Sequence, residues 1–318
     1  MAKKIVTVVG ATGKQGKGVI AAFDKGSFHI RGLTRNPDST SAKALAAQGV
    51  EVVKADLGDV NSLRVAFAGS HIIYAMTDFY EPMERWGPEK ATEIEKLQGT
   101  NMAKAANEVL TLEHYIWSTL PKDSDEFPVP HFRSKHAVDN IIESEYPALN
   151  AKTTLFVPCF YFDNLALSSY RPQWFETAKT YVQLTTYPPD TMVPGLGAPE
   201  INITPFIKAI VESPDKTQNA TLVVAIAEVT TAEGWVQAWA SAKGVKVRTV
   251  RVSRENFDAL WPLPNWAEEF AKMFEYFEKV PLQEWSKPGK TILTKETLGV
   301  TGLQGLQAWA ESWELPTI

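Results

Sequence analysis

Six short runs rich in β-branched and other apolar residues alternate with segments of helical pattern in the first half of the chain. The runs are KIVTVVG, HIRGLTR, VEVVKADL, HIIYAMT, LEHYIWST and TTLFVPC. Parallel strands need a long crossover connection, usually a helix, so this alternation is typical of a parallel sheet. We therefore predict an α/β fold in which helices flank a parallel sheet.

The segments between the runs predict two clear helices. Residues 15–25 form the first, and residues 91–110 form a longer one whose apolar residues recur as in a helix that covers a sheet. This apolar stripe consists of Ile94, Leu97, Met102, Ala105 and Val109. The charged residues of these and later helical segments are interpreted as solvated faces: Glu93, Glu95, Lys96, Glu268, Glu269 and Glu275.

The second half is less regular and predicts a smaller α+β lobe. A helix is expected over 230–244, because Gly244 tolerates the left-handed cap that ends helices. A later helical stripe is interpreted as core packing rather than as a cofactor site: Phe270, Met273, Phe274 and Phe277. Strands are expected within 181–189, 220–227 and 245–253, and Pro188, Pro189, Pro194 and Gly195 predict a long loop.

Composition restricts the classes of function. A length of 318 residues suits two lobes, which we place at 1–155 for a first domain and 156–318 for a partly interleaved substrate-binding lobe. Hydrophobic residues at 44% and a net charge of −5 give no basic footprint for nucleic acid or for an anionic membrane. One cysteine, Cys159, and the absence of a signal-peptide pattern predict a cytoplasmic protein, and no histidine or cysteine spacing predicts a metal site. A small molecule is the expected partner.

Three glycines follow the first apolar run in the segment VVGATGKQGKG. Gly10, Gly13 and Gly16 have the spacing G-x-x-G-x-x-G at the end of a strand and the start of a helix. In that context they permit a tight turn and let a pyrophosphate approach the backbone at the helix N-terminus. The alternative is a glycine-rich turn without a ligand. The strands that follow favour a Rossmann-type sheet that binds a dinucleotide.

The end of the second run indicates which dinucleotide. An NAD site usually carries an acidic residue about 20 residues after the glycines, whereas a 2′-phosphate requires a cation. Here Arg35 occupies that position beside Asn36, and the nearest acid, Asp38, lies beyond Pro37. This pattern favours NADP(H). The alternative for Arg35 is a solvated surface arginine.

Several ordered motifs resemble those of the NmrA-like atypical short-chain dehydrogenase/reductases. They are GATGKQG, LTRNP, YAMTDFYE, LQGTNMAKAA, HYIWSTLP, HFRSKHAVDNII and FVPCFYFDNLAL, and they extend over the first half of the chain. The resemblance implies a Rossmann domain that holds NADP(H) and a smaller lobe that closes over the nicotinamide. The family contains both reductases and non-catalytic sensors that bind a dinucleotide to regulate a protein partner.

The resemblance also implies positions for the cofactor and substrate. The phosphate loop would include Thr12, Lys14 and Gln15, the adenine would meet Asp56 and Leu57, and Met76 and Thr77 would follow the fourth strand. Beside the nicotinamide it implies Pro158, Phe160 and Tyr161, with Phe160, Tyr161 and Asn164 as substrate-binding residues. For Phe160 and Tyr161 the alternative is packing between the lobes.

The catalytic residues are implied by the same resemblance. Typical short-chain reductases use a serine at the end of the fifth strand and a Tyr-x-x-x-Lys pair on the next helix. The tyrosine donates a proton, and the lysine holds the ribose. This chain has Ser118 and Lys135 but carries His131 in the tyrosine position. An imidazole suits proton donation near neutrality, although His131 as a structural residue and Lys135 as a surface lysine remain alternatives.

These observations predict an NADPH-dependent reductase. Its substrate would be a hydrophobic, aromatic or alkaloid-like small molecule with a C=N, C=O or activated C=C bond. The alternative is a regulator that senses NADP(H) and acts through a protein partner. An open cavity beside the nicotinamide would favour the enzyme.

Overall fold

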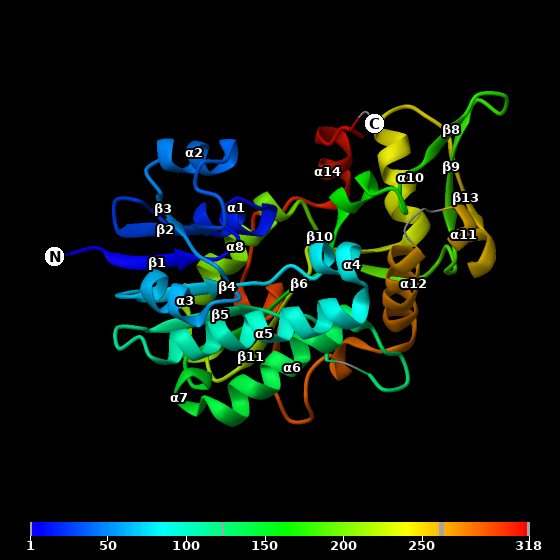
Figure 1. The fold of residues 1–318 in the computed structure, drawn as a ribbon. Coiled ribbons are helices and arrows are strands. Elements are labelled where there is room, and N and C mark those ends of the chain that lie inside the picture. The colour runs from blue at the N-terminus through cyan, green and yellow to red at the C-terminus, as the bar shows by residue number, and fades with distance from the viewer. Residues whose placement is uncertain (1, 123, 261–263, 317–318) are drawn as a thin grey trace.

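The fold is built on one eight-stranded sheet (Figure 1). The computed structural model describes residues 2–122, 124–260 and 264–316. The strands are all parallel and lie in the order β14-β11-β6-β5-β4-β1-β2-β3. Their bounds are Lys4–Val8 for β1, Phe28–Thr34 for β2, Glu51–Lys54 for β3, Ile72–Ala75 for β4, His114–Ser118 for β5, Thr153–Pro158 for β6, Thr221–Ala225 for β11 and Ile292–Leu293 for β14. The predicted Rossmann-type fold class is confirmed, and all six early runs contribute strands.

Helices cover both faces of this sheet. Helix α5 (Pro88–Asn107) packs against both α3 (Val60–Phe67) and α6 (Pro130–Glu145), whereas α1 (Lys14–Ile20) belongs to a separate group of helices, and α2 (Thr40–Ala47) lies at the top of Figure 1, beyond β3. Helix α8 (Pro199–Glu212) packs closely on α1, because a Cβ at Gly18 would lie 2.7 Å from the Pro199 carbonyl oxygen. The strand order reverses between β1 and β4, and a crevice forms at such a point beyond the carboxyl ends of the strands.

A second lobe, defined by two small sheets and the helices beside them, lies at the right of Figure 1. One sheet has the order β12-β10-β7 and the other β13-β9-β8. The strands are β7 (Phe160–Tyr161), β8 (Gln173–Phe175), β9 (Thr180–Thr185), β10 (Met192–Gly197), β12 (Glu228–Thr231) and β13 (Val247–Arg251). The helices are α10 (Ala232–Ala242), α11 (Arg254–Leu260), α12 (Pro264–Lys279) and α14 (Leu306–Ser312).

The remaining short helices come from both halves of the chain. They are α4 (Tyr80–Trp86), α7 (Pro147–Asn150), α9 (Pro214–Thr217), α13 (Lys295–Leu298), η1 (Phe162–Ala166) and η2 (Leu282–Glu284).

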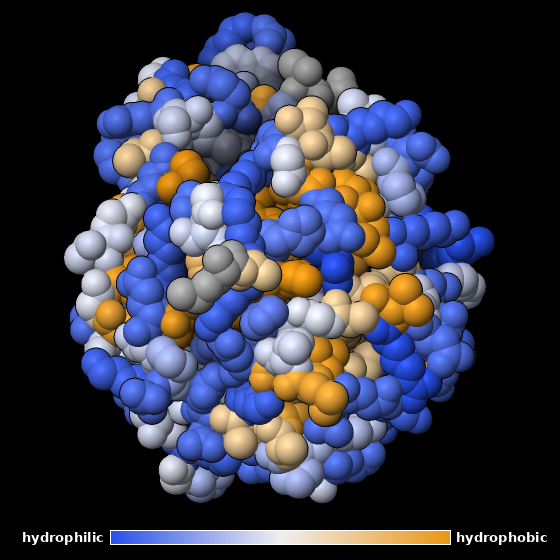
Figure 2. All heavy atoms as spheres, turned by 90° about the vertical axis from the view of Figure 1, so that its left-hand side faces the viewer, coloured by the Kyte–Doolittle hydropathy of each residue, from blue (hydrophilic) through white to orange (hydrophobic). Residues whose placement is uncertain are grey.

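The two lobes are interleaved in sequence. Strands β11 and β14 belong to the second half of the chain but complete the large sheet, and β6 crosses residue 155. The division into 1–155 and 156–318 therefore stays a prediction about domains. The face shown in Figure 2 carries mainly hydrophilic residues, with hydrophobic residues gathered in smaller areas between them. Among the described helices, none has the length and apolar character needed to span a membrane.

Three local expectations were wrong. The predicted helix 15–25 ends at Ile20, because the N–H groups of Ala22 and Phe23 donate to carbonyls only three residues before them, those of Val19 and Ile20. Leu97 is 54% exposed on the outer side of α5. The predicted loop over 188–195 contains the start of β10, where a Cβ at Gly195 would lie 2.2 Å from the Phe162 ring. That glycine serves ring packing in a strand rather than flexibility in a loop.

Candidate active site

Two adjoining cavities occupy the crevice. A cleft of about 670 Å³ follows the carboxyl ends of β1, β2 and β3, and a second cavity of about 410 Å³ lies between the sheet and α12. We call them the cleft and the inner cavity. Five residues line both: Lys14, Gln15, Met76, Asp78 and Tyr161. A long ligand can therefore lie in the cleft with one end in the inner cavity.

Glycine is present at the three positions of the first turn for different physical reasons. Gly10 has φ +67°, and a Cβ there would lie 2.7 Å from the sulfur of Met76. A Cβ at Gly16 would lie 2.2 Å from the Gly10 carbonyl oxygen, so close packing of α1 requires glycine. Gly13 is exposed, has φ −86°, and has only one atom, at 3.4 Å, near the place of its missing Cβ. Packing explains Gly10 and Gly16, whereas Gly13 leaves bare backbone facing the cleft.

The predicted cofactor, catalytic and substrate-binding residues divide between the two cavities. Those that line the cleft are Gly10, Thr12, Gly13, Lys14, Gln15, Arg35, Asn36, Asp56, Leu57, Met76 and Tyr161. Those that line the inner cavity, besides the residues common to both, are Thr77, Ser118, His131, Lys135, Pro158, Phe160 and Asn164. Gly16 is buried and lines neither cavity.

Arg35 has a partner that sequence analysis missed. Its guanidinium contacts both carboxylate oxygens of Glu81 on α4, with Nη2 to Oε2 at 2.7 Å and Nη1 to Oε1 at 3.0 Å. The hydrogen bond from Arg35 lowers the pKa of the Glu81 carboxyl, and the same bond raises the pKa of Arg35. Both side chains line the cleft. An acid is therefore present at this end of the cleft, and it comes from α4 rather than from β2.

Ser118 lies at the carboxyl end of β5 and contacts the glycine loop. Its hydroxyl donates to Oε1 of Gln15 at 3.0 Å, and the Tyr74 hydroxyl donates to the same oxygen at 2.7 Å. Burial raises the pKa of the Tyr74 and Tyr161 hydroxyls above their usual range, so both stay protonated at neutral pH. The amide of Gln15 is thus held at the junction of the two cavities.

Lys135 is buried and lines the inner cavity. Its Nζ donates to the Thr77 hydroxyl at 2.6 Å and to the Thr77 carbonyl at 3.2 Å, and it pairs with Oε1 of Glu95 at 3.2 Å. The Trp117 ring centroid lies 4.9 Å from the ammonium. Lys135 is only 6% exposed, so it is not a surface lysine.

Glu95 was wrongly interpreted as solvated, since none of its surface is exposed. It accepts hydrogen bonds from the hydroxyls of Thr77 and Ser134 in addition to its ion pair with Lys135. Helices α5 and α6 pack side by side, and α6 carries Ser134 and Lys135 against this carboxylate. A buried carboxylate is stable only with such partners.

His131 forms a second buried pair, this time with the other lobe. Its Nδ1 is hydrogen-bonded to Oε1 of Glu269 on α12, and its backbone N–H donates to the same oxygen at 3.0 Å. Glu269 is 2% exposed, so its interpretation as a solvated residue was also wrong. The ring packs beside Phe79 and Tyr80, with centroid distances of 5.9 and 5.7 Å. His131 lines the inner cavity, and no hydrogen bond of its Nε2 is found within the described part of the chain.

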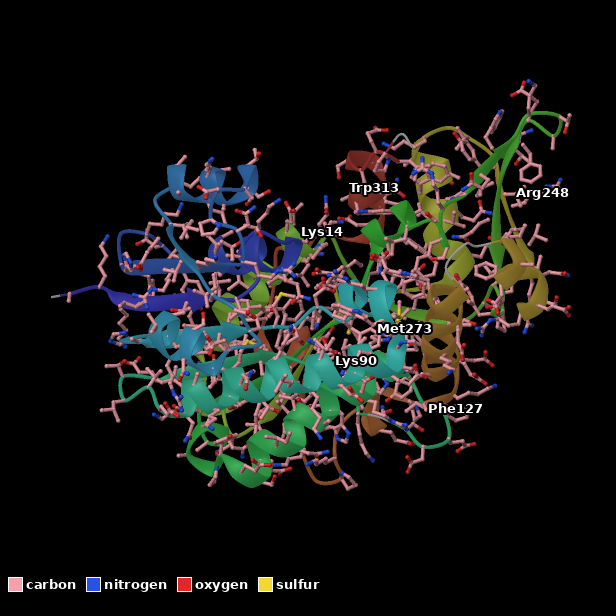
Figure 3. All side chains as sticks on the ribbon, viewed as in Figure 1. Lys14, Lys90, Phe127, Arg248, Met273 and Trp313 are labelled. Carbon is pink, nitrogen blue, oxygen red and sulfur yellow. The ribbon has the colours of Figure 1, made fainter. Side chains whose placement is uncertain are left out.

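Aromatic side chains from α4 and α12 form one wall of the inner cavity. The rings of Tyr80 and Trp266 stack at 4.9 Å and 13°. The stripe on α12 was assigned to core packing, and Phe270, Met273 and Phe274 are buried core residues, with Phe277 packed against them. Phe274 stacks on Tyr187 at 3.8 Å. The other three members also line the cavity, which the sequence did not predict. Figure 3 labels Met273 on α12 close to α4, and Lys14 at the opposite side of the crevice.

A salt bridge also connects the glycine loop to the second lobe. Nζ of Lys14 contacts Oδ2 of Asp163 in η1 at 2.8 Å, and Oδ1 of Asp163 accepts a hydrogen bond from Trp309 on α14 at 2.9 Å. Asn164 follows Asp163 in η1 and lines the inner cavity. The position of η1 therefore depends on residues from both lobes.

Comparison with known proteins places the chain in a family. The model of the NmrA-like family matches residues 2–296. The chain belongs to the NmrA-like family. The family predicted from the sequence motifs is thus confirmed. A likeness of fold alone could not have established it, because the solved structures described below share little sequence identity with the chain.

Among curated relatives, the NmrA-like family domain-containing oxidoreductase ptmS of Penicillium ochrochloron is 36% identical over 95 residues, which are 29% of this chain and 28% of the relative. The oxidoreductase hkm9 of Aspergillus hancockii is 34% identical over 124 residues, 38% of this chain and 35% of the relative. The matching segments thus span little more than a third of these relatives at most.

Solved structures share the fold over almost the whole chain. The negative transcriptional regulator NmrA in complex with NADP has a TM-score of 0.76 at 22% identity and covers 98% of this chain and 95% of its own. The triphenylmethane reductase of Citrobacter sp., complexed with NADP(H), has a TM-score of 0.67 at 19% identity and covers 96% and 99%. At these identities the comparison establishes the common fold.

Proposed function

We propose that this NmrA-like protein is an NADPH-dependent reductase that transfers hydride to a hydrophobic small molecule with a C=N, C=O or activated C=C bond. The observation that carries the proposal is the open inner cavity of about 410 Å³ at the end of the cleft, lined by His131 and Lys135. The names of the curated relatives as oxidoreductases support it. The nicotinamide would supply the hydride when bound.

The residues of the cleft fit a dinucleotide. The bare backbone at Gly13 has no packing explanation, and it lies where a pyrophosphate would approach the chain. Arg35 lines the cleft just after β2, where we propose that the adenosine ribose and its 2′-phosphate bind. These features support NADP(H) as the cofactor, in keeping with the NADP(H) held by two of the structural neighbours.

Lys135 is proposed to hold the nicotinamide ribose. Thr77 and Glu95 fix the ammonium at the rim of the inner cavity, so the cation is positioned before the cofactor arrives. Such positioning lowers the barrier because the reacting groups do not have to be ordered during the reaction. Glu95 is then a positioning residue that acts through Lys135.

His131 is proposed to deliver the proton to a neutral substrate. Glu269 at Nδ1 fixes the orientation of the ring and balances the positive charge of the doubly protonated imidazole. Nε2 can then donate to an oxygen, nitrogen or carbon atom in the inner cavity. A preformed iminium accepts hydride without this proton, so its reduction requires only binding and orientation.

The aromatic wall supports a flat, hydrophobic substrate of aromatic or alkaloid-like character. Phe270, Tyr80 and Trp266 offer ring faces. The buried carboxylate of Glu95 lines the cavity, and that of Glu269 contacts the lining residue His131. Ring faces attract cations as well as flat apolar groups. This lining is compatible with a protonated imine.

His131→Asn tests the proton donor. The asparagine amide can occupy the place of Nδ1 and keep a hydrogen bond to Glu269, while the atom corresponding to Nε2 is removed. We expect kcat for a neutral enone or aldehyde to fall about 100-fold, with reduction of a preformed iminium changed less than twofold. Unchanged turnover of the neutral substrate, with a deuterium isotope effect showing that hydride transfer limits the rate, would exclude His131 as the donor.

A further inference from the structure

We propose that Glu81 tunes the choice between NADP(H) and NAD(H) by competing with the 2′-phosphate for Arg35. The inference rests on the proposed function, because it assumes that the cleft holds a dinucleotide. It concerns α4, a short helix whose residues line both cavities. Glu81 would thus be a specificity residue outside the glycine turn and the end of β2, the two places where cofactor preference is usually found.

In the contact between Arg35 and Glu81, the carboxylate meets the guanidinium in the way that a phosphate would. Two nitrogens of the Arg35 guanidinium meet the two carboxylate oxygens of Glu81 at 2.7 and 3.0 Å. A guanidinium binds carboxylates and phosphates in this same forked arrangement. The face of Arg35 that suits a 2′-phosphate is therefore already occupied by an anion.

The pair is accessible and can open. The Arg35 and Glu81 side chains are 73% and 51% exposed, and contact with water makes an exposed ion pair of this kind weak. A phosphate that carries nearly two negative charges can displace the carboxylate from Arg35, but Glu81 then remains nearby as a like charge. NADP(H) binding is weakened by both effects.

NAD(H) meets different chemistry at the same place. Its 2′-hydroxyl carries no charge, so the ion pair between Arg35 and Glu81 can persist, and a carboxylate accepts a hydrogen bond from a ribose hydroxyl. The affinity for NAD(H) is thus expected to be almost independent of the competition. Asp56 lines the cleft, and Asp78 lines it where it joins the inner cavity; both act on Arg35 at longer range.

A second cation, Arg85 on α4, lines the same cleft as Arg35. Arg85 lines the cleft one turn after Glu81, and its guanidinium lies 4.8 Å from the ring centroid of Trp86. Arg85 partly offsets the charge of Glu81 when a phosphate binds. Removing the charge of Glu81 would leave two cations, Arg35 and Arg85, at the 2′-phosphate position.

Glu81→Gln tests this competition, with Glu84→Gln as the matched control. Glu84 lies on the same helix and is exposed, but it does not line the cleft. Both variants keep the size of the side chain and remove one negative charge. Calorimetric titration of the full chain with NADP⁺ and with NAD⁺ measures the two dissociation constants without any substrate, and circular dichroism verifies that each variant is folded.

We expect Glu81→Gln to lower the dissociation constant for NADP⁺ at least fivefold and to change that for NAD⁺ less than twofold. Glu84→Gln should change both less than twofold. Adenosine 2′,5′-bisphosphate should gain affinity as NADP⁺ does, because it carries the 2′-phosphate without the nicotinamide. An NADP⁺ affinity that is unchanged or weaker in Glu81→Gln, or an equal gain in Glu84→Gln, would overturn the inference while leaving the proposed function intact. Failure of the native chain to bind either dinucleotide would overturn both.

Discussion

Substitution of Gly13 separates ligand binding from folding. A valine side chain at residue 13 meets almost no internal resistance, since the nearest atom to the added Cβ is the Gly10 carbonyl oxygen at 3.4 Å and φ is −86°. The remaining effect on stability is the loss of glycine at a helix N-cap, about 1 kcal/mol. For a chain of this size we expect the midpoint of thermal unfolding to fall by about 2–4 °C.

The effect of Gly13→Val on binding is expected to be much larger. Two methyl groups would stand where the pyrophosphate must reach backbone N–H groups. A hydrogen bond to a charged group contributes about 1.5–3 kcal/mol, so the loss of two such bonds weakens NADP⁺ binding by at least 100-fold, about 2.7 kcal/mol. Calorimetric titration measures this loss, and circular dichroism measures the thermal midpoint of the same sample.

Gly16→Ala is the matched control, because it should show the opposite behaviour. Its Cβ would lie 2.2 Å from the Gly10 carbonyl oxygen and 2.6 Å from the Cα of Ala11, so the backbone must shift. We expect a loss of stability of about 3 kcal/mol, the upper part of the usual range for overpacking. If Gly13→Val is folded and binds NADP⁺ with native affinity, then the interpretation of the glycine turn is refuted.

Three further predictions concern charged side chains. The native chain should bind NADPH at least tenfold more tightly than NADH, about 1.4 kcal/mol, and Arg35→Asp should remove this preference; equal native dissociation constants by calorimetry would contradict it. Lys135→Met should weaken NADP⁺ binding and lower stability by about 3–5 kcal/mol, because Glu95 is left buried without its cation. Adding Glu95→Gln should recover most of the stability in urea unfolding but not the affinity, and recovery of both would show that Lys135 only compensates Glu95. Burial raises the pKa of Asp139 from 3.8 to about 7. Between pH 3.8 and pH 7 the folded state therefore holds this proton and the unfolded state does not. The stability that Asp139 contributes falls as the pH rises through this range. Asp139→Asn should therefore gain stability relative to the native protein between pH 5 and pH 8, and a constant difference would contradict this prediction.

The sheet and the glycine turn were predictable because their signals are local. A short apolar run predicts each strand of the first half. The turn after β1 carries its three glycines within seven residues of sequence, from Gly10 to Gly16. The sequence could not separate the roles of these glycines. That distinction depends on Met76 and Ala11, whose positions follow only from the folded turn.

The acidic partners were missed because they come from distant segments. His131 and Glu269 are 138 residues apart in sequence, and Arg35 and Glu81 are 46 apart. A carboxylate is normally solvated unless a partner offsets its burial, and a single helix does not reveal a partner on another. Sequence analysis alone therefore assigned Glu269 to an exposed face and gave Glu81 no role.

A usable sequence signal was nevertheless present for the two buried acids, Glu95 and Glu269. Glu95 lies four residues after the buried Ala91 and seven before the buried Met102, so it shares the inward face of α5. Glu269 lies four residues before Met273 on the apolar stripe of α12. An acid inside an apolar stripe indicates a buried charge with a partner, and this rule would have selected both residues.

The central claim is that the inner cavity carries out hydride transfer. The most direct test incubates the native chain with NADPH deuterated at either the pro-R or the pro-S position of C4 and with a panel of imines, enones, aldehydes and an iminium salt, followed by mass spectrometry of the products. The account predicts deuterium in a reduced product from one labelled cofactor and not from the other. Tight binding of NADPH without deuterium in any product of the panel would contradict the reductase and favour a regulator that binds the dinucleotide without turnover.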